Sequence, residues 1–184
     1  AILKTTGDEN MGICDQRTVI ITGSGSGLGK AYALAYAAEG ANVVVNDIRV
    51  EAAEAVRDEI IAAGGRAIAT CDDITRMETA QKIVDAAVAA YGEVHVVVNN
   101  AGILRDRMFV SLSEDDWDQV MRVHLRGHFC LANILAKRWR DQSKAGNAVE
   151  ARIINTTSGA GLQGSIGQSN YSAAKGGIAT LTLV

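Results

Sequence analysis

The sequence predicts an α/β fold in which helices cover both faces of a doubly wound parallel sheet. Apolar, β-branched runs alternate with alanine-rich segments of helical length. The runs are continuous, as in strands that are buried on both faces. A glycine-rich turn joins the first run to the first helical segment. Strands that alternate with helices build right-handed βαβ units, and such units make a parallel sheet.

The elements follow one another in a regular order along the chain. Strands are expected at 18–21, 42–45, 67–69, 94–98 and 151–154. Helices are expected at 27–39, 50–63, 76–91, 114–142 and 170–184. Gly40, Gly64 and Gly92 stand where three of these helices end, as glycine often does. Ser113 precedes three acidic residues and is expected to cap the fourth helix.

The composition is typical of a soluble globular protein and argues against two classes of partner. The chain has 184 residues, of which 48% are hydrophobic and 21% charged. Its net charge of -3 offers no basic surface for nucleic acid, and no run of eighteen or more apolar residues suggests a membrane span. The three cysteines are widely separated and lack metal-ligand spacing. They predict reduced thiols, no bound metal and a cytoplasmic location.

The first strand runs directly into the turn Thr-Gly-Ser-Gly-Ser-Gly-Leu-Gly at 22–29. Backbone without side chains lets a pyrophosphate approach closely, and the helix that follows presents its free N–H groups. The spacing is T-G-x-x-x-G-x-G, with Gly23, Gly27 and Gly29 at its fixed positions and Ser26 and Leu28 between them. A flexible linker is the alternative, but the strand before and the helix after favour a Rossmann-type dinucleotide site.

Aspartates follow the second and third strands. Asp47 lies eighteen residues past Gly29, where a dinucleotide fold places an acid that binds the adenosine ribose 2′-hydroxyl. A carboxylate there repels a 2′-phosphate, so NAD is favoured over NADP, unless Arg49 turns inward and weakens the preference. Asp73 is expected to accept from the adenine amino group, with the Ile74 backbone beside the ring, or else to cap the next helix. A solvated turn residue is the alternative for Asp47.

Tyr171 and Lys175 are one helical turn apart, and Ser158 precedes the tyrosine by thirteen positions. An ammonium group on the same helix face favours the phenolate form of the tyrosine, and a nearby serine hydroxyl can hold a substrate oxygen. These three residues are the candidates for proton transfer. The alternative is a buried tyrosine and a solvated lysine, because a Y-x-x-x-K pattern alone often arises by chance.

Together, the motifs resemble the short-chain dehydrogenase/reductase family from about residue 12 to the end. They are T-G-x-x-x-G-x-G at 22–29, Asn99-Asn100-Ala101-Gly102 after the fourth strand, Ser158 after the fifth, and Tyr171-x-x-x-Lys175. The resemblance implies that Asn100, Ala101 and Gly102 pack beside the cofactor. It also implies that Tyr171 is the general acid/base and that Lys175 holds the nicotinamide ribose as well.

Within this family, segments 102–108, 117–118 and 122–127 are most similar to (3R)-hydroxyacyl-CoA dehydrogenase domains of multifunctional β-oxidation enzymes and to 3-oxoacyl-ACP reductase-like enzymes. This similarity implies an NAD-dependent oxidoreductase of fatty acid metabolism that acts on a 3-hydroxyacyl thioester or a similar bulky secondary alcohol. The alternatives are an NADPH-dependent 3-oxoacyl or steroid-type carbonyl reductase, and a non-catalytic dinucleotide-binding module. The Ser, Tyr and Lys set favours an enzyme, because a binding module does not need the Tyr-Lys pair.

His124 departs from the pattern of the family. Many members carry an asparagine at this position, whose backbone and side chain hold a water that links the lysine to solvent. A histidine can relay protons itself, since its unperturbed pKa is near 6.5. It can also be a packing residue inside the predicted helix at 114–142. His124 is therefore a fourth candidate catalytic residue, with both roles open.

The sequence stops at Val184, inside the last predicted helix, whereas family members continue for several tens of residues. We expect residues 12–184 to form one dinucleotide-binding and catalytic domain that lacks its C-terminal strands. Residues 1–11 are expected to be a disordered arm or an expression remnant. The apolar faces of the helices at 114–142 and 170–184 suit subunit packing in a homodimer or homotetramer, or burial against the sheet.

Overall fold

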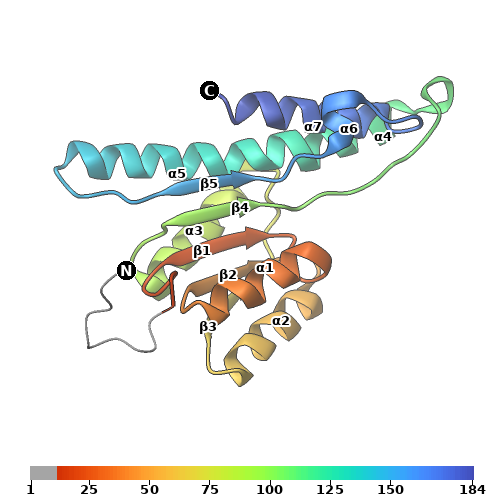
Figure 1. The fold of residues 1–184 in the computed structure, drawn as a ribbon. Helices are drawn as coiled ribbons and strands as arrows, with labels where there is room; N and C mark the ends of the chain where they lie inside the picture. The colour runs from red at the N-terminus through yellow and green to blue at the C-terminus, as the bar shows by residue number, and fades with distance from the viewer. Residues whose placement is uncertain (1–11) are drawn as a thin grey trace, which may run out of the picture.

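A computed structural model describes residues 12–184, and the arm predicted at 1–11 lies outside these residues. Five parallel strands form one sheet in the order β3-β2-β1-β4-β5 (Figure 1). The strands are β1 (Thr18–Thr22), β2 (Asn42–Asn46), β3 (Arg66–Thr70), β4 (Val96–Asn99) and β5 (Arg152–Asn155). All five strands predicted from the sequence are present, with ends that differ by two residues at most. The doubly wound parallel sheet is therefore confirmed.

The helices agree with prediction in the first half of the chain and differ in the second. They are α1 (Gly27–Ala38), α2 (Val50–Ala62), α3 (Met77–Tyr91), α4 (Glu114–Met121), α5 (Gly127–Lys144), α6 (Gly159–Gln163) and α7 (Ser169–Leu181), with a short 3₁₀ turn, η1 (Phe109–Ser111). None of the helices described between residues 12 and 184 combines the length and the apolar character needed to cross a membrane.

The helix predicted at 114–142 is present as a continuous helical run from Glu114 to Lys144, but a π-helical segment that was not predicted, η2 (Arg122–Arg126), lies inside it between α4 and α5. A π-helical turn adds a residue to the turn, and the apolar spacing of a sequence does not reveal it. The short helix α6 was not predicted either. Its five residues include two glycines and carry no helical period of apolar residues.

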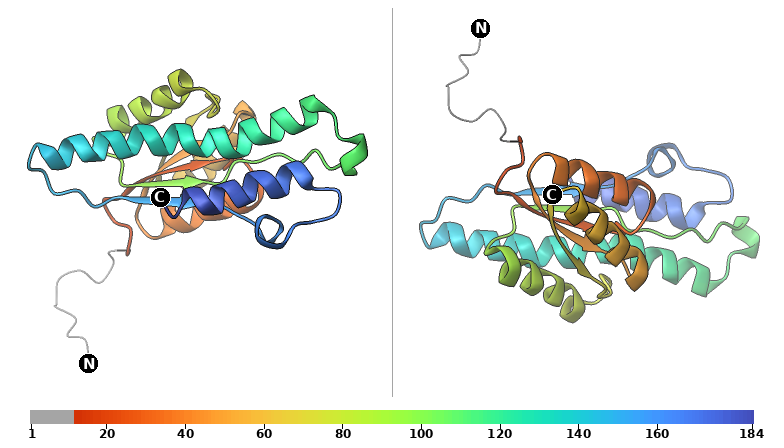
Figure 2. Two further views of the ribbon diagram at one scale, coloured as in Figure 1. Left: turned by 90° about the horizontal axis from the view of Figure 1, so that it is seen from above. Right: turned by 90° about the horizontal axis from the view of Figure 1, so that it is seen from below.

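Successive residues of the central strands point to opposite faces of the sheet, and each face has its own core. Val19, Ile21, Val43 and Val45 pack against α1 and α2. Residues from the alternate positions of the same strands pack against α3 and α5, namely Ile20, Val44 and Val97. Figure 2 shows α3, α5 and α7 lying side by side on this second face. These two cores fix the register of the strands and hence the position of their carboxyl ends.

The fifth strand is less well covered than predicted. β1 and β2 are buried along their whole length, whereas in β5 Ile153 is 36% exposed and Ile154 is 42% exposed. The strand lies at one edge of the sheet and pairs only with β4 within the described residues. The expectation of strands covered on both faces is therefore wrong for β5.

The order of the strands reverses between β1 and β4, and ligands of doubly wound sheets bind at such a switch point.

Candidate cofactor and catalytic site

The glycine-rich turn joins β1 to α1 at the point where the strand order reverses. Gly23 has φ of 63°, a left-handed conformation that side-chain-bearing residues rarely adopt. A Cβ on Gly29 would lie 2.2 Å from the carbonyl oxygen of Gly23, so only glycine fits where α1 starts. The turn is therefore held close to the strand at the start of α1, where a helix has N–H groups without partners in its own first turn.

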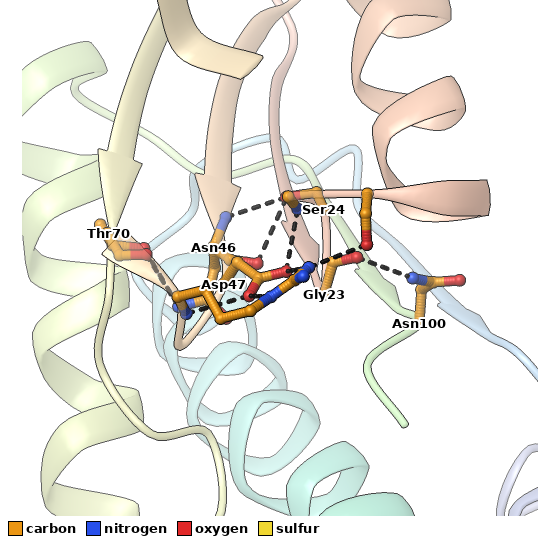
Figure 3. Close-up of polar contacts among 9 residues, drawn as sticks. Gly23, Ser24, Asn46, Asp47, Thr70 and Asn100 are labelled. Carbon is orange, nitrogen blue, oxygen red and sulfur yellow. Dashed lines mark hydrogen bonds and ion pairs between the residues drawn. The ribbon is translucent and has the colours of Figure 1, made fainter. Parts of the chain in front are cut away.

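Hydrogen bonds to Thr22 connect the glycine-rich turn to the segment after β4. The Thr22 hydroxyl accepts hydrogen bonds from the backbone N–H groups of Asn100 and Ala101, each at 3.0 Å. In return, the Asn100 side-chain amide donates to the carbonyl oxygen of Thr22 at 3.1 Å and to that of Gly23 at 3.4 Å (Figure 3). The two segments predicted to bind the cofactor are thus held together by side chains from both.

A buried polar network that the sequence analysis missed supports the same edge of the sheet (Figure 3). Ser24 donates to the carbonyl oxygen of Ile21 at 2.7 Å and accepts from the N–H of Asn46 at 3.0 Å. The Asn46 amide donates to the Thr70 hydroxyl at 3.2 Å. Each of these residues lies at or just beyond the carboxyl end of a strand, which is the signal that could have identified them.

Asp47 follows β2 and is 7% exposed, so it is not a solvated turn residue. Its carboxylate accepts from the N–H of Gly25 at 3.0 Å and from both the N–H and the side chain of Arg49, at 3.0 and 3.2 Å. Burial raises the pKa of this carboxyl, but the hydrogen bonds from Arg49 and Gly25 outweigh burial, and the pKa lies below its usual range. The carboxylate is therefore ionised at neutral pH.

Arg49 turns inward over the glycine-rich turn. Its guanidinium pairs with Asp47 and donates to the Ser26 hydroxyl at 2.8 Å. The sequence analysis raised this arrangement only as a condition that would weaken the preference for NAD. The structure brings the arginine, the aspartate and the serine together at the place where the adenosine ribose is expected.

Asp73 bonds to the residue two positions later. Its two carboxylate oxygens accept from the N–H and the hydroxyl of Thr75, at 2.8 and 2.9 Å. The N-cap position of α3 is occupied by Arg76, so the alternative of Asp73 as the cap of that helix is wrong. The side chain remains partly buried beside the cavity described next.

A cavity of about 480 Å³ opens at the switch point. Eight of the predicted cofactor residues line it: Gly23, Ser26, Asp47, Asp73, Ile74, Asn100, Ala101 and Gly102. Five do not: Gly27, Leu28, Gly29, Tyr171 and Lys175. The lining also includes residues that were not predicted to bind the cofactor: Asn46, Ile48, Arg49, Asp72, Thr75, Ile103 and Val123. The lining residues come from the carboxyl ends of β1, β2, β3 and β4 and from Val123 in η2.

Ser158 stands at the N-cap of α6, where its hydroxyl accepts from the N–H of Ala160 at 3.2 Å. A Cβ on Gly161 would lie 2.5 Å from the carbonyl carbon of Lys175, so the backbones of α6 and α7 are in direct contact. The Thr157 hydroxyl also donates to the Lys175 carbonyl oxygen at 2.7 Å. Close packing of two glycine-containing helices thus places the start of α6, which carries Ser158, beside the backbone of α7 at Lys175.

Lys175 is 2% exposed, so the alternative of a solvated lysine is wrong. Its ammonium donates to the Thr156 carbonyl oxygen at 2.5 Å and lies 5.7 Å from the centre of the Tyr171 ring. Burial lowers the pKa of Lys175 to about 8. The side chain therefore carries its charge at neutral pH and gives it up just above.

The start of α7 is anchored by Asn170, another residue that the sequence analysis missed. Its side-chain amide is fully buried and donates to the carbonyl oxygens of Arg105 and Asp116, at 3.1 and 3.2 Å. Its side-chain oxygen accepts from the N–H of Tyr171 at 2.8 Å. The loop after β4 and the helix α4 thus set the position of the tyrosine.

His124 lies in the π-helical segment η2, with its ring against the tyrosine. The ring centres of His124 and Tyr171 are 5.2 Å apart, and the planes are nearly perpendicular. Nε2 contacts the backbone N–H and carbonyl oxygen of Ile103, at 3.0 and 2.8 Å. Burial lowers the pKa of His124 to about 4, although the Ile103 carbonyl favours the charged form. The imidazole is therefore neutral at neutral pH.

Comparison with known proteins agrees with this geometry. The model of the short chain dehydrogenase family matches residues 17–184. The chain is 47% identical over 175 residues to a protein named hydroxyacyl-CoA dehydrogenase ChsB1 from Mycobacterium tuberculosis, covering 91% of this chain and 55% of that relative. It is 46% identical over 173 residues to the peroxisomal multifunctional enzyme type 2 of Mus musculus, covering 89% of this chain and 22% of that relative.

A solved structure of similar sequence has the same fold. The crystal structure of a short chain dehydrogenase from Mycobacterium avium has a TM-score of 0.91 and 54% sequence identity, covering 94% of this chain and 62% of that chain. The chain thus spans about half the length of the first relative and under two thirds of the solved structure. Since the family model covers nearly all of the described residues, the chain belongs to the short-chain dehydrogenase family.

Proposed function

We propose that this chain is the cofactor-binding and catalytic part of an NAD-dependent oxidoreductase that moves a hydride between a secondary alcohol and nicotinamide. Its substrate is a 3-hydroxyacyl thioester or a similar bulky hydroxy compound. The buried, charged Lys175 beside the ring of Tyr171 carries the proposal, because a binding module has no use for such a pair. The names of the relatives support the substrate class.

The three candidate catalytic residues divide the proton chemistry among them. Ser158 donates a hydrogen bond to the substrate oxygen, and Tyr171 takes the hydroxyl proton during oxidation and returns it during reduction. The charge of Lys175 favours the phenolate form of the tyrosine. Bound nicotinamide dinucleotide supplies the hydride acceptor or donor. Positioning and proton transfer are the contribution of the protein.

The cavity residues fit an adenine dinucleotide. The turn at 22–29 offers backbone N–H groups to a pyrophosphate, and a Cβ on Gly25 would strike the Asp47 carboxylate at 2.8 Å, so the cradle requires glycine. Asp47 is assigned to the ribose hydroxyls, and Asp73 and Ile74 to the adenine. The ionised Asp47 supports NAD, whereas Arg49 partly neutralises it and keeps a lesser affinity for NADP.

His124 is assigned a positioning role at the catalytic tyrosine. Its neutral ring, held by the Ile103 backbone, contacts the Tyr171 ring edge to face. A pKa of about 4 makes this imidazole a poor proton carrier at neutral pH. The role of a packing residue that also orients the phenol therefore fits the geometry better than an independent catalytic role.

We further propose that the enzyme assembles as a homodimer or homotetramer through α4, α5 and α7. A groove of about 920 Å³ between these helices is lined by apolar side chains that include Met121, Leu125, Phe129 and Leu181. The Phe129 side chain is 46% exposed. A second copy would cover this surface, which light scattering of the full-length protein tests. The cytoplasmic location stays a prediction.

Steady-state assays of the full-length protein test the proposed reaction. Oxidation of 3-hydroxyacyl-CoA is expected with NAD and, less efficiently, with NADP. In Tyr171→Phe, the loss of the phenolic hydroxyl removes proton transfer, and turnover should fall by about 10²–10⁴-fold while NAD binding persists. Unchanged turnover in Tyr171→Phe would refute the mechanism. Faster reduction with NADPH than with NADH would favour the biosynthetic reductase instead. NAD binding without any turnover would favour the non-catalytic binding module.

A further inference from the structure

A groove between α3 and α5, called the α3–α5 groove below, lies apart from the sites already described. Its volume is about 600 Å³, which is within the range of small-molecule sites, and Figure 2 shows the two helices side by side. The lining comes from the first half of α3, from the middle and end of α5, and from the segment that follows α5. None of these residues lines the cofactor cavity or the apolar groove proposed for subunit contact.

An arginine interrupts the apolar face of α5 at this groove. Four side chains of α5 recur at the spacing of one helix face and are buried: Leu131, Ile134, Leu135 and Trp139. Arg138, seven residues after Leu131 and four after Ile134, belongs to the same face. The Trp139 indole donates to a backbone carbonyl oxygen just before β4 at 2.8 Å, which fixes the rotation of α5 here. Arg138 is therefore partly buried at the groove.

Nε of the Arg138 guanidinium is buried and has no hydrogen-bond partner among residues 12–184. Asp141 lines the same groove, but its carboxylate pairs with Arg140 at 2.8 Å. An arginine stays protonated in proteins, and a buried charge is costly unless it is paired. An unsatisfied buried donor of this kind calls for a water, an ion or a ligand.

A second cation and two amides favour an anionic ligand over a water molecule. Lys137 lines the α3–α5 groove together with Arg138, and Asn133 and Asn147 contribute side-chain amides. Two cations face a single carboxylate that is already paired, so the groove has a net positive charge. Ile134 adds apolar surface to the same lining. The groove thus combines charge, N–H donors and an apolar wall, as small-molecule sites do.

We propose that the α3–α5 groove binds a small dianion, either a phosphate monoester or a dicarboxylate, through Arg138 and Lys137. A guanidinium matches both groups with paired N–H donors, and such charge-assisted hydrogen bonds are about twice as strong as neutral ones. The amides of Asn133 and Asn147 donate to the remaining oxygens, and the carbon part of the ligand packs on Ile134. The site is independent of the proposed reaction, because the catalytic and cofactor residues take no part in it.

Calorimetric titration of the full-length protein with inorganic phosphate and, separately, with succinate tests the site. NAD is present, so that the pyrophosphate cradle is filled. We expect saturable binding of one dianion or both, and binding should weaken by at least about tenfold in Arg138→Met. Tighter binding of phosphate would identify the ligand as a phosphate monoester, and tighter binding of succinate would identify it as a dicarboxylate. Binding of neither dianion overturns the proposal.

Lys144→Met is the matched control. Lys144 is an exposed cation in the last turn of α5 and does not line the groove. This variant loses the same charge as Arg138→Met but should bind both probes as the unsubstituted protein does. Unchanged binding in Arg138→Met, or an equal loss of binding in the two variants, overturns the proposal.

Thermal unfolding gives a second readout. Arg138→Met removes the unpaired charge and keeps an apolar stem, so without added anion the midpoint should rise by about 2–4 °C. Phosphate or succinate should raise the midpoint of the unsubstituted protein but not that of Arg138→Met. A lower midpoint for the anion-free variant would show that Arg138 has a partner within the full-length chain, and this result overturns the proposal.

A measurement on the unsubstituted protein covers the case in which Arg138→Met does not fold. In side-chain ¹H–¹⁵N spectra, the Nε–H signal of Arg138 should shift saturably as phosphate or succinate is added. A signal that stays in place with both dianions overturns the proposal.

Discussion

The cofactor half of the molecule, residues 18–75, and the catalytic half, residues 152–181, are stabilised in different ways. In the cofactor half, β1 and β2 are buried throughout, and the polar contacts of Ser24 and Asp47 join neighbouring strand ends. In the catalytic half, β5 is exposed, and the side chains depend on partners far away in the sequence. Asn170, for example, bonds to Arg105, which is 65 positions earlier. Cofactor binding and turnover should therefore respond separately to substitution.

Of Ser158→Ala, Gly161→Ala and Asp47→Asn, we expect Ser158→Ala to have the largest effect, which lowers turnover and leaves cofactor binding unchanged. Loss of the hydroxyl removes a donor to the substrate oxygen, and kcat should fall by about 10²–10³-fold. Loss of the cap of α6 should also lower the free energy of unfolding by about 1 kcal/mol. Calorimetric titration should show unchanged NAD affinity. Ser158→Thr, which keeps the hydroxyl, is the control, and an equal loss of kcat in both variants would contradict the assigned role.

Gly161→Ala should have an intermediate effect, through the packing of the catalytic half. The added Cβ would lie 2.5 Å from the backbone of α7, so the helices must separate, at a cost of about 1–3 kcal/mol in unfolding free energy. Displacement of Lys175 should lower kcat as well. Gly159→Ala is the matched control two residues earlier, because its Cβ has no neighbour closer than 3.8 Å. Chemical denaturation of both variants measures the difference, and equal stabilities would show that the close contact is unimportant.

Asp47→Asn should give the smallest effect, confined to the cofactor half. The amide cannot repel a 2′-phosphate, and Arg49 is released from its ion pair. NAD affinity should fall about tenfold, or about 1.4 kcal/mol, and NADP affinity should rise, with kcat at saturating cofactor unchanged. Asp72→Asn is the control, because Asp72 lines the same cavity without a side-chain hydrogen bond to Arg49. An unchanged ratio of the two affinities would contradict the assignment of Asp47 to the ribose.

The cofactor half, in which the contacts are local, was predicted better from the sequence than the catalytic half. The strand, the turn at 22–29 and the helix that follows are consecutive in sequence, so their residue types report the structure directly. The inward turn of Arg49 over Ser26 was raised only as a condition, because a rotamer depends on neighbours from another turn. The π-helical segment at Arg122–Arg126 and the five-residue helix α6 were not predicted, since neither has a periodic pattern.

By itself, the sequence determined the parallel doubly wound sheet, the glycine-rich turn and the candidate Ser158, Tyr171 and Lys175. Period and spacing are local properties, and they are enough for these features. Only the tertiary structure decided that Lys175 is buried with a pKa of about 8 and that the ring of His124 packs against the ring of Tyr171. Burial and proximity arise when distant segments pack together, and the chemistry of the site depends on the dielectric environment that this packing creates.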